Sequence, residues 1–284
     1  MSPIAGPALA SVLRSPSMRI PRAPARLALL AAAAGLVLLW SGPASAQSTL
    51  PTGEQYRLRL EYLWWSPQPS GQIQKGVSEI EGTLLDVETD LGIEKAEANA
   101  VRGSLRLGES WKLRGSWTPL DFGGDVAADQ AFAYGTTVVL ADQRVVTSLK
   151  GNYFTSELAW DFVRRPSGVL GLLIGVKYFD VDVLLVNADT ESRVAETERL
   201  PVPVLGLAGR AYLGQRLSVE GEVSGLPAGD RGHVWEVLLA ARVHLSDRLA
   251  GTAGWRKLVI EGKDGRDFFS LALGQWTYGV ELSL

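Results

Sequence analysis

Gln275-Trp276-Thr277-Tyr278-Gly279-Val280-Glu281-Leu282-Ser283-Leu284, the last ten residues, carry apolar side chains at even positions and polar or small side chains at odd positions. Successive side chains of a β-strand point to opposite faces, so this stretch predicts a strand with one apolar and one polar face. The alternation reaches the final residue, where a soluble domain usually frays. The pattern therefore indicates a terminal strand that a sheet holds to its end.

The same alternation recurs about ten times along the chain, for example in 56–65, 153–163 and 204–213. Long connections, at 70–97, 121–147, 187–198, 225–232 and 261–266, follow the odd-numbered segments, whereas two to five residues follow the even-numbered ones. Long loops at one end and short turns at the other are typical of transmembrane β-barrels. We predict an all-β, antiparallel, up-and-down barrel of about ten strands in an outer membrane.

Eight or twelve strands are the alternatives to this count. The segments at Thr83 and Thr136 have strand-like composition, and the fifth expected strand, 169–183, alternates least regularly. Within the long connections we expect a short hairpin around 83–87, and we expect 136–140 and 144–146 to extend the flanking strands.

The first 46 residues have the pattern of a signal peptide. Four arginines precede the apolar run 27–40, and Ala44-Ser45-Ala46 supplies the small residues before a cleavage site, so we expect cleavage before Gln47. The run is shorter than the ~20 residues of a spanning helix, which disfavours a retained anchor. We expect one mature barrel domain, 47–284, with translation starting at Met1 or Met18.

Composition narrows the function classes. The chain has no cysteine, which removes disulfides, thiolate metal sites and cysteine nucleophiles. Without the first 46 residues the net charge changes from −3 to −7, and no basic block remains, which excludes nucleic acid as a partner. The partners we expect are outer-membrane lipid and the barrel-assembly machinery, with small solutes or loop ligands in addition.

A secreted β-sandwich that binds through its loops is the alternative fold. Seven tryptophans favour the barrel because they lie mostly on the apolar faces near strand ends, as in an interfacial girdle: Trp64, Trp111, Trp117, Trp160, Trp235, Trp255 and Trp276. A sandwich pools its large rings in one core.

The polar faces of the strands repeat arginine, lysine and glutamate. In a barrel these side chains face the lumen: Arg57, Arg59, Glu61, Arg102, Arg106, Lys112, Arg114, Arg210, Glu220, Glu222, Glu236, Arg242, Arg256 and Glu281. Buried charges must pair or meet water, and ten strands enclose little more space than side chains fill. We expect a largely plugged lumen in a structural or loop-presenting protein. A narrow pore with slight anion preference is the alternative.

We expect no enzyme and no cofactor, although three groups have the composition of a site. His244 and Ser246 match the spacing of outer-membrane lipid hydrolases, but Asp247 follows where those have Asn. Asp230 and His233, with Asp180 and Asp182, match the needs of an outer-membrane protease. Calcium fits a third group, in the loop carrying Asp86, Glu88 and Asp90. The simpler explanation of the same residues is an interior His244 that pairs with Arg242 or a neighbouring acid, together with ordinary acidic loops.

Several strands resemble those of the small, porin-like outer-membrane β-barrel proteins of proteobacteria, many without an assigned function. The resemblance lies in Leu172–Asp182 (LLIGVKYFDVD), Gly206–Arg210 (GLAGR), Leu217–Glu222 (LSVEGE) and Ala253–Arg256 (AGWR). It implies a barrel over most of 55–284 and no catalytic signature. Two departures are Lys257-Leu258-Val259, where Tyr-Leu-Asp is usual, and Leu284, where the assembly signal has Phe.

Overall fold

The computed structural model describes residues 54–76, 82–94, 97–227, 232–264 and 267–284. The expected signal peptide, its cleavage site and Asp230 lie outside these residues. No helix in the described part of the chain is long and apolar enough to span a membrane.

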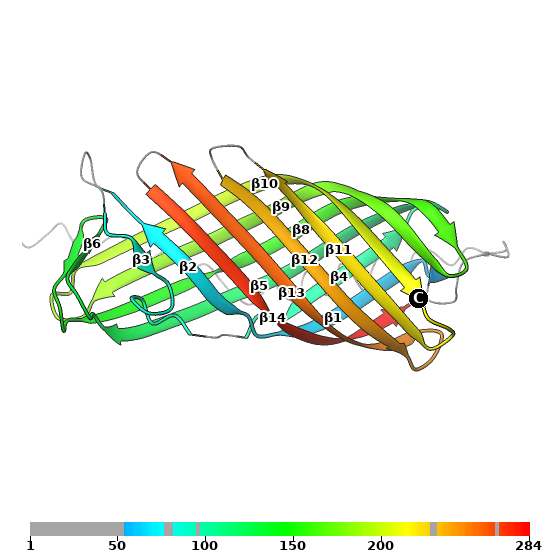
Figure 1. Ribbon diagram of the computed structural model, residues 1–284, viewed down its shortest axis with the longest axis horizontal. Helices are drawn as coiled ribbons and strands as arrows, with labels where there is room; N and C mark the ends of the chain where they lie inside the picture. Colours follow the sequence, from blue (N-terminus) through cyan, green and yellow to red (C-terminus); the bar gives the residue numbers. More distant parts are fainter. Residues whose placement is uncertain (1–53, 77–81, 95–96, 228–231, 265–266) are drawn as a thin grey trace, which may run out of the picture. The chain divides into compact units, whose positions relative to one another are not determined.

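Ten strands of the described residues form one closed antiparallel barrel (Figure 1). Their bounds are β1 Leu58–Trp65, β4 Ala100–Arg106, β5 Trp111–Ala127, β8 Arg144–Arg165, β9 Gly168–Asn187, β10 Arg193–Tyr212, β11 Leu217–Pro227, β12 Gly232–His244, β13 Leu249–Asp264 and β14 Asp267–Ser283. Each strand pairs with the next, and β14 returns to β1 with the register Glu61↔Glu281. The closed, up-and-down architecture predicted from the alternation is confirmed.

The first wall strand is interrupted. β1 pairs with the final part of β14, and β2 (Gln68–Gln74) pairs with the initial part. The two short strands therefore lie one after the other along the same edge of β14. Pro67, which has no backbone N–H, lies at the break. β3 (Leu85–Asp86), within the stretch expected to form a hairpin, pairs with β2, and a bridge between Ile93 and Gly124 connects the following loop to β5.

β8 begins at Arg144, so the expected extension of this strand by 144–146 is confirmed. The expected start of the next long strand was wrong, because β10 begins at Arg193 instead of 204. Pro201 and Pro203 lie inside β10, and its pairing with β9 continues through both. Proline is tolerated there because the pairing of β10 with β11 starts only at Leu205, so the missing N–H groups leave no ladder bond unmade.

The connection between β5 and β8 contains its own hairpin. β6 (Phe132–Tyr134) pairs with β7 (Thr137–Val139) and with no strand of the barrel wall among the described residues. The expectation that 136–140 extends a flanking strand was therefore wrong. The hairpin lies at the end opposite the short turns, as Figure 1 shows with β6 at the left and the C-terminus at the right.

The two halves of the barrel enclose opposite kinds of side chains. Near the short turns, which we call the membrane half, β8 directs Glu157 and Asp161 inward and Leu158 and Trp160 outward. Toward the hairpin, in the outer half, the same strand buries Leu149 inward. Exposed ion pairs such as Asp121–Lys150 line the outside there. The strand keeps one alternation of faces while polar and apolar residues exchange positions along it.

Candidate functional site

Charged side chains fill the lumen of the membrane half. Nine basic and eight acidic side chains of the described residues meet there, and most are nearly inaccessible to solvent. The basic ones are Arg59, Arg102, Arg106, Lys112, Arg114, Lys177, Arg210, Arg242 and Arg256. The acidic ones are Glu54, Glu61, Glu157, Asp161, Glu220, Glu222, Glu236 and Glu281. Charges so nearly balanced satisfy one another without counter-ions.

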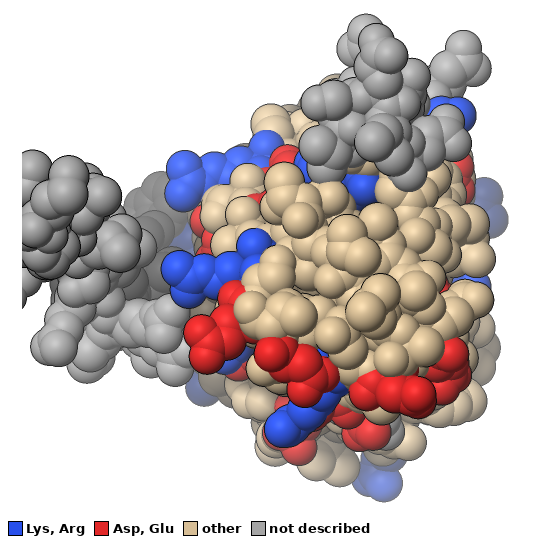
Figure 2. Space-filling model, turned by 90° about the vertical axis from the view of Figure 1, so that its left-hand side faces the viewer, with Lys and Arg blue, Asp and Glu red and all other residues tan. Residues whose placement is uncertain are grey.

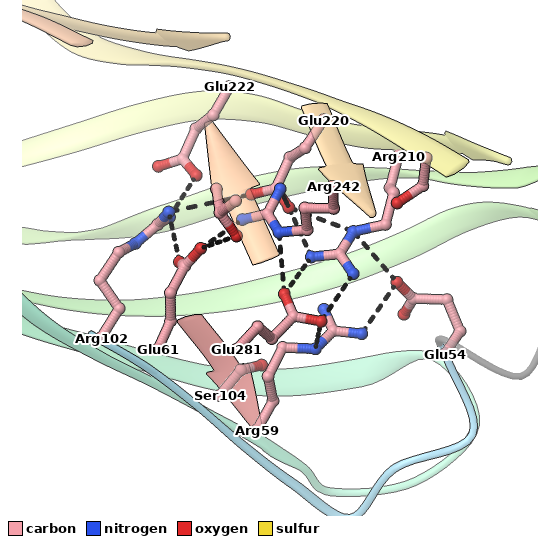
Figure 3. Close-up of polar contacts among 12 residues, drawn as sticks. Glu54, Arg59, Glu61, Arg102, Ser104, Arg210, Glu220, Glu222, Arg242 and Glu281 are labelled. Atoms are coloured by element: carbon pink, nitrogen blue, oxygen red, sulfur yellow. Dashed lines mark hydrogen bonds and ion pairs between the residues drawn. The ribbon is translucent and has the colours of Figure 1, made fainter. Parts of the chain in front are cut away.

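Arg242 is the centre of this network (Figure 3). Its guanidinium, 1% exposed, lies 2.8 Å from Glu61, 2.7 Å from Glu220 and 2.8 Å from Glu281. These carboxylates come from β1, β11 and β14, so one arginine of β12 connects strands on both sides of its own. Arg114 of β5 binds Glu222 in the same layer.

Arg210 and Arg102 extend the network in two directions. Arg210 of β10 donates to Glu220 at 2.7 Å and to Glu281 at 2.9 Å. Arg102 of β4 donates to Glu222 at 2.9 Å and forms an ion pair of 3.2 Å with Glu61 (Figure 3). Multiple partners offset the loss of hydration for Arg102 and Arg210.

Glu236 organises a second layer at the border of the two halves. It accepts from Tyr153 Oη at 2.6 Å, from Arg256 at 2.6 to 2.7 Å and from the fully buried Lys177. The guanidinium of Arg256 lies 4.5 Å from the ring centroid of Trp65. Aromatic rings and charges therefore meet here, below the apolar filling of the outer half.

Little space remains between these side chains. One cavity of about 70 Å³ lies against Gly171, Leu173 and Ala208, on the wall of β9 and β10 that carries small residues. A second, of about 30 Å³, is lined by Glu157 and Arg256 among others. A buried water needs at least ~10–15 Å³ and several polar partners, so each cavity has room for water and not for a larger solute.

The lumen of the outer half is apolar. Buried side chains from the wall, from the loop after β3 and from the hairpin pack into one cluster. It includes Trp65, Leu85, Leu91, Ile93, Leu120, Phe122, Phe132, Tyr134, Val139, Leu149, Tyr153, Phe179, Leu185, Leu258, Ile260, Leu271 and Leu273. The barrel is therefore blocked twice, by paired charges and by an apolar plug above them.

A three-way ion pair fastens the outer end. Lys75 Nζ, after β2, lies 3.1 Å from Glu196 of β10 and 3.0 Å from Asp267 of β14. The hydrogen bond to Asp267 raises the pKa of Lys75. Burial opposes ionisation of Asp267, but the N–H of Gly76 and the ammonium of Lys75 outweigh it and lower the pKa of Asp267. Burial and nearby Glu196 raise the pKa of Tyr134 to about 12.

Thirteen of the fourteen charged residues predicted to face the lumen are placed there. Arg57 is the exception, because regular strand pairing begins at Leu58 and the side chain of Arg57 is exposed. Tyr56, expected on the outer apolar face, is instead buried with its ring 3.8 Å from the guanidinium carbon of Arg59. Alternation cannot be extended backward past the first paired residue.

The sequence did not predict three members of the networks, whereas Glu157 and Asp161 belong to the polar face of the expected strand 153–163. Glu54 precedes β1, outside any alternating segment, yet bonds Arg59 and Arg106 at 3.3 and 2.9 Å. Lys177 and Tyr153 lie where strands change from charged to apolar filling, so the apparent pattern breaks there. Continuing the parity of Val169, Gly171 and Leu173 along β9 would have placed Lys177 inside.

The expected pairing of His244 with an arginine or an acid was wrong. Its Nε2 is 3.0 Å from Ser218 Oγ, and its ring stacks on Tyr212. Ser246 Oγ instead accepts from the N–H groups of Arg248 and Leu249 in the turn. Ser218 is fully buried, so its hydroxyl has no access to lipid or to a substrate from water.

The other acidic candidates have local partners. Asp180 and Asp182 point outward from β9 and bond Arg199 and Thr197 of β10, so they do not converge on the mouth. His233 lies on the outward-facing parity of β12. Asp86 Oδ1 accepts from the N–H groups of Glu88 and Thr89, and Asp90 accepts from Asp86 N. No His, Asp or Glu cluster of metal-binding type is present among the described residues.

No family model matches this chain, and no curated protein matches it significantly in sequence. Among solved structures, the outer-membrane protease OmpT from Escherichia coli is similar with a TM-score of 0.58 and 10% identity, over 84% of this chain and 100% of OmpT. This chain has the fold of the outer-membrane β-barrel proteins.

Two further outer-membrane barrels are similar in part. The translocator domain of the autotransporter NalP from Neisseria meningitidis has a TM-score of 0.41 and 14% identity, over 92% of this chain and 98% of that one. The attachment invasion locus protein Ail of Yersinia pestis has a TM-score of 0.36 and 7% identity, over 80% and 98%. At such identities the likeness is one of fold, and the activities of these barrels do not carry over.

Proposed function

We propose that this protein resides in an outer membrane as a closed, non-conducting and non-enzymatic barrel whose function is structural or is carried by its outer end. Its partners are the surrounding lipid and the machinery that inserts barrels. A belt of outward apolar side chains supports the location, among them Leu172, Ile174 and Leu239. A similar belt around a soluble protein would be an aggregation surface.

The observation that carries the proposal is the double block of the lumen. A solute would have to separate ion pairs of 2.7 to 3.2 Å around Arg242 and Arg102, and then displace packed rings such as Phe122 and Phe179. Each step exposes groups whose partners are then lost, at a cost of several kcal/mol. Thermal motion therefore opens no standing pathway.

A narrow pore is the second candidate. The lumen has one more basic than acidic side chain among the described residues, which favours a slight anion preference if water connects the cavities. Single-channel recording distinguishes the two functions. We expect no steps from the wild-type barrel in a planar bilayer, with insertion verified by a heat-dependent shift on a denaturing gel.

A variant of the plug tests whether the charged layer alone closes the lumen. Leu120→Ser with Phe122→Ser loosens the apolar plug, and Asp121→Ser on the outer face of the same strand is the matched control. We expect the plug variant to remain closed because the charged layer still blocks the lumen. Conductance of the wild-type barrel would establish the pore instead. Release of fatty acid or peptide by the wild-type barrel would establish an enzyme.

A further inference from the structure

The β6–β7 hairpin is apolar on both faces. Phe132, Tyr134 and Val139 pack downward into the plug, each 6% exposed or less. On the opposite face Val138 is 60% exposed and Leu140 57% exposed. The hairpin lies at the outer end, beyond the lipid-facing belt, so the membrane that surrounds the barrel does not cover these two side chains.

Polar contacts hold the hairpin in place. Thr137 Oγ1 is 3.0 Å from Ser192 Oγ, and Asn187 Nδ2 donates to the carbonyl of Val138 at 3.2 Å. On the other side Thr83 N donates to the carbonyl of Ala133 at 2.9 Å, which brings the exposed Leu84 beside the hairpin. A fixed apolar surface loses little conformational entropy when a partner binds it.

The charge around this surface is mostly negative. Lys75 and Arg144, at its border, are paired with Glu196, Asp267 and Asp125. The described segments 82–94, 128–143 and 188–192, which meet at the hairpin, contain eight acidic residues and no lysine or arginine. Asp129, Asp142 and Glu191 are exposed and form no ion pair among the described residues. Figure 2, which looks onto this end, shows a broad uncharged area with acidic side chains along its lower border and basic side chains mainly at its left. We call this surface the outer cap.

We propose that the outer cap binds a cationic, amphipathic protein segment, with its apolar side chains on Val138 and Leu140 and its lysine or arginine side chains beside Asp142 and Glu191. Charge complementarity selects this occupant, because an anionic lipid surface would be repelled by the acidic loops. The inference rests on the proposed function in one respect, that this end of the barrel faces the exterior.

The test is peptide binding to the full-length barrel in a lipid nanodisc, measured by fluorescence anisotropy. The probe is a synthetic peptide of alternating lysine and leucine, compared with a lysine–serine and a glutamate–leucine peptide of equal length. We expect the lysine–leucine peptide alone to bind, with an affinity that falls as salt screens the charges.

Two variants divide the surface into its parts. Val138→Ser with Leu140→Ser removes the apolar contact, and we expect binding about tenfold weaker. Asp142→Asn with Glu191→Gln removes charge, and we expect binding about three- to tenfold weaker and less dependent on salt. Asp142 has a φ of 65°, which asparagine adopts readily, so the loop is preserved.

The matched control is Leu245→Ser with Asp247→Asn, an equivalent change in an exposed turn at the opposite end. It should leave binding unchanged. Equal binding of the lysine–serine peptide, or unchanged binding in the Val138 and Leu140 variant, would overturn the proposal. Binding of zwitterionic lipid vesicles without the peptide would also overturn it, by assigning the cap to a lipid surface. Conductance tests the closed barrel separately, so either idea can fail alone.

Discussion

The membrane half and the outer half use the same strands with opposite contents. In β8 the inward residues are Asp161 and Glu157 in the membrane half, and Tyr153 and Leu149 toward the outer half. With the proposed position in the membrane, the charges are enclosed where lipid lies outside, and the apolar side chains are enclosed where water lies outside. The comparison teaches that alternation specifies a strand, whereas the surrounding solvent decides whether polar or apolar side chains are enclosed.

The halves are also stabilised by different forces. The charged lumen depends on complete pairing, since one missing partner leaves a buried charge uncompensated. The apolar plug depends on packed volume, and a missing methyl group leaves a cavity of limited cost. Substitutions at matched positions in the two halves separate these contributions.

The largest effect is expected from Arg242→Ala. Removing this guanidinium leaves Glu61, Glu220 and Glu281 buried with fewer partners, and we expect the free energy of unfolding to fall by about 3–5 kcal/mol. Urea unfolding followed by tryptophan fluorescence measures it. Lys150→Ala, which breaks an exposed pair with Asp121, is the control and should cost less than about 1 kcal/mol. Equal effects of the two would show that the lumen is hydrated.

In the apolar plug, the loss of stability should depend on the side-chain volume that a substitution removes. Leu185→Ala, in the outer half and 1% exposed, should lower the free energy of unfolding by about 2–5 kcal/mol. Its outward neighbour Leu184, in the same strand, is the matched site, and Leu184→Ala should have a small effect. A small effect at both sites would mean that the outer half is loosely packed and contributes little to stability.

The location of the membrane boundary can be read from one strand. Ile174→Arg on the outward face of β9 should destabilise the barrel by about 2–4 kcal/mol, because arginine enters the hydrocarbon layer. Leu184→Arg, ten residues further on the same face, should change stability by less than about 0.5 kcal/mol. Similar losses at both sites would place the outer half inside the membrane and contradict the division proposed here.

The smallest effect concerns the ion pair at Lys75. The lowered pKa of Asp267 contributes stability above the usual carboxylate range, and this contribution is lost as the pH falls through the pKa of the folded state. The raised pKa of Lys75 contributes below the usual lysine range and is lost as the pH rises. The protection factors of β2 amides, which correct for the intrinsic pH dependence of hydrogen exchange, should therefore fall at both extremes.

Asp267→Asn tests this prediction. The acid-side change in exchange should disappear in the variant, whereas amides of β12 in the membrane half should exchange alike in both proteins. An unchanged pH profile in the variant would show that the ion pair does not hold β2. The groups are partly exposed, so the effect on overall stability is below about 1 kcal/mol.

The sequence predicted the architecture because alternation and connection length are local properties. It predicted most of the charged lumen for the same reason, since Arg102, Arg210 and Arg242 lie in regular segments. It did not predict the outer half, where Arg193–Glu198 has the composition of a loop but forms strand. Solvent outside that part of the barrel makes polar outward residues compatible with strand, which composition alone does not reveal.

The sequence also did not show which charges of the network pair with one another. Glu54 and Glu281 lie 227 positions apart in the sequence and reach the same Arg210, a contact set by closure of the barrel and by no local pattern. The outer cap was missed for a related reason. Val138 and Leu140 have ordinary strand composition, and only the folded hairpin shows that they face away from the plug.

The contacts of Arg210 and Arg242 have a consequence for assembly. Both arginines belong to strands in the second half of the chain, yet both bind Glu281 of the last strand, and their further partners Glu54 and Glu61 lie at the start of the described chain. The pairs with Glu220 need only β10 to β12, whereas the pairs with Glu54 and Glu61 form only when the first and last strands meet. The seam is thus sealed by a late, cooperative event that favours one registration of the two ends over any slipped one.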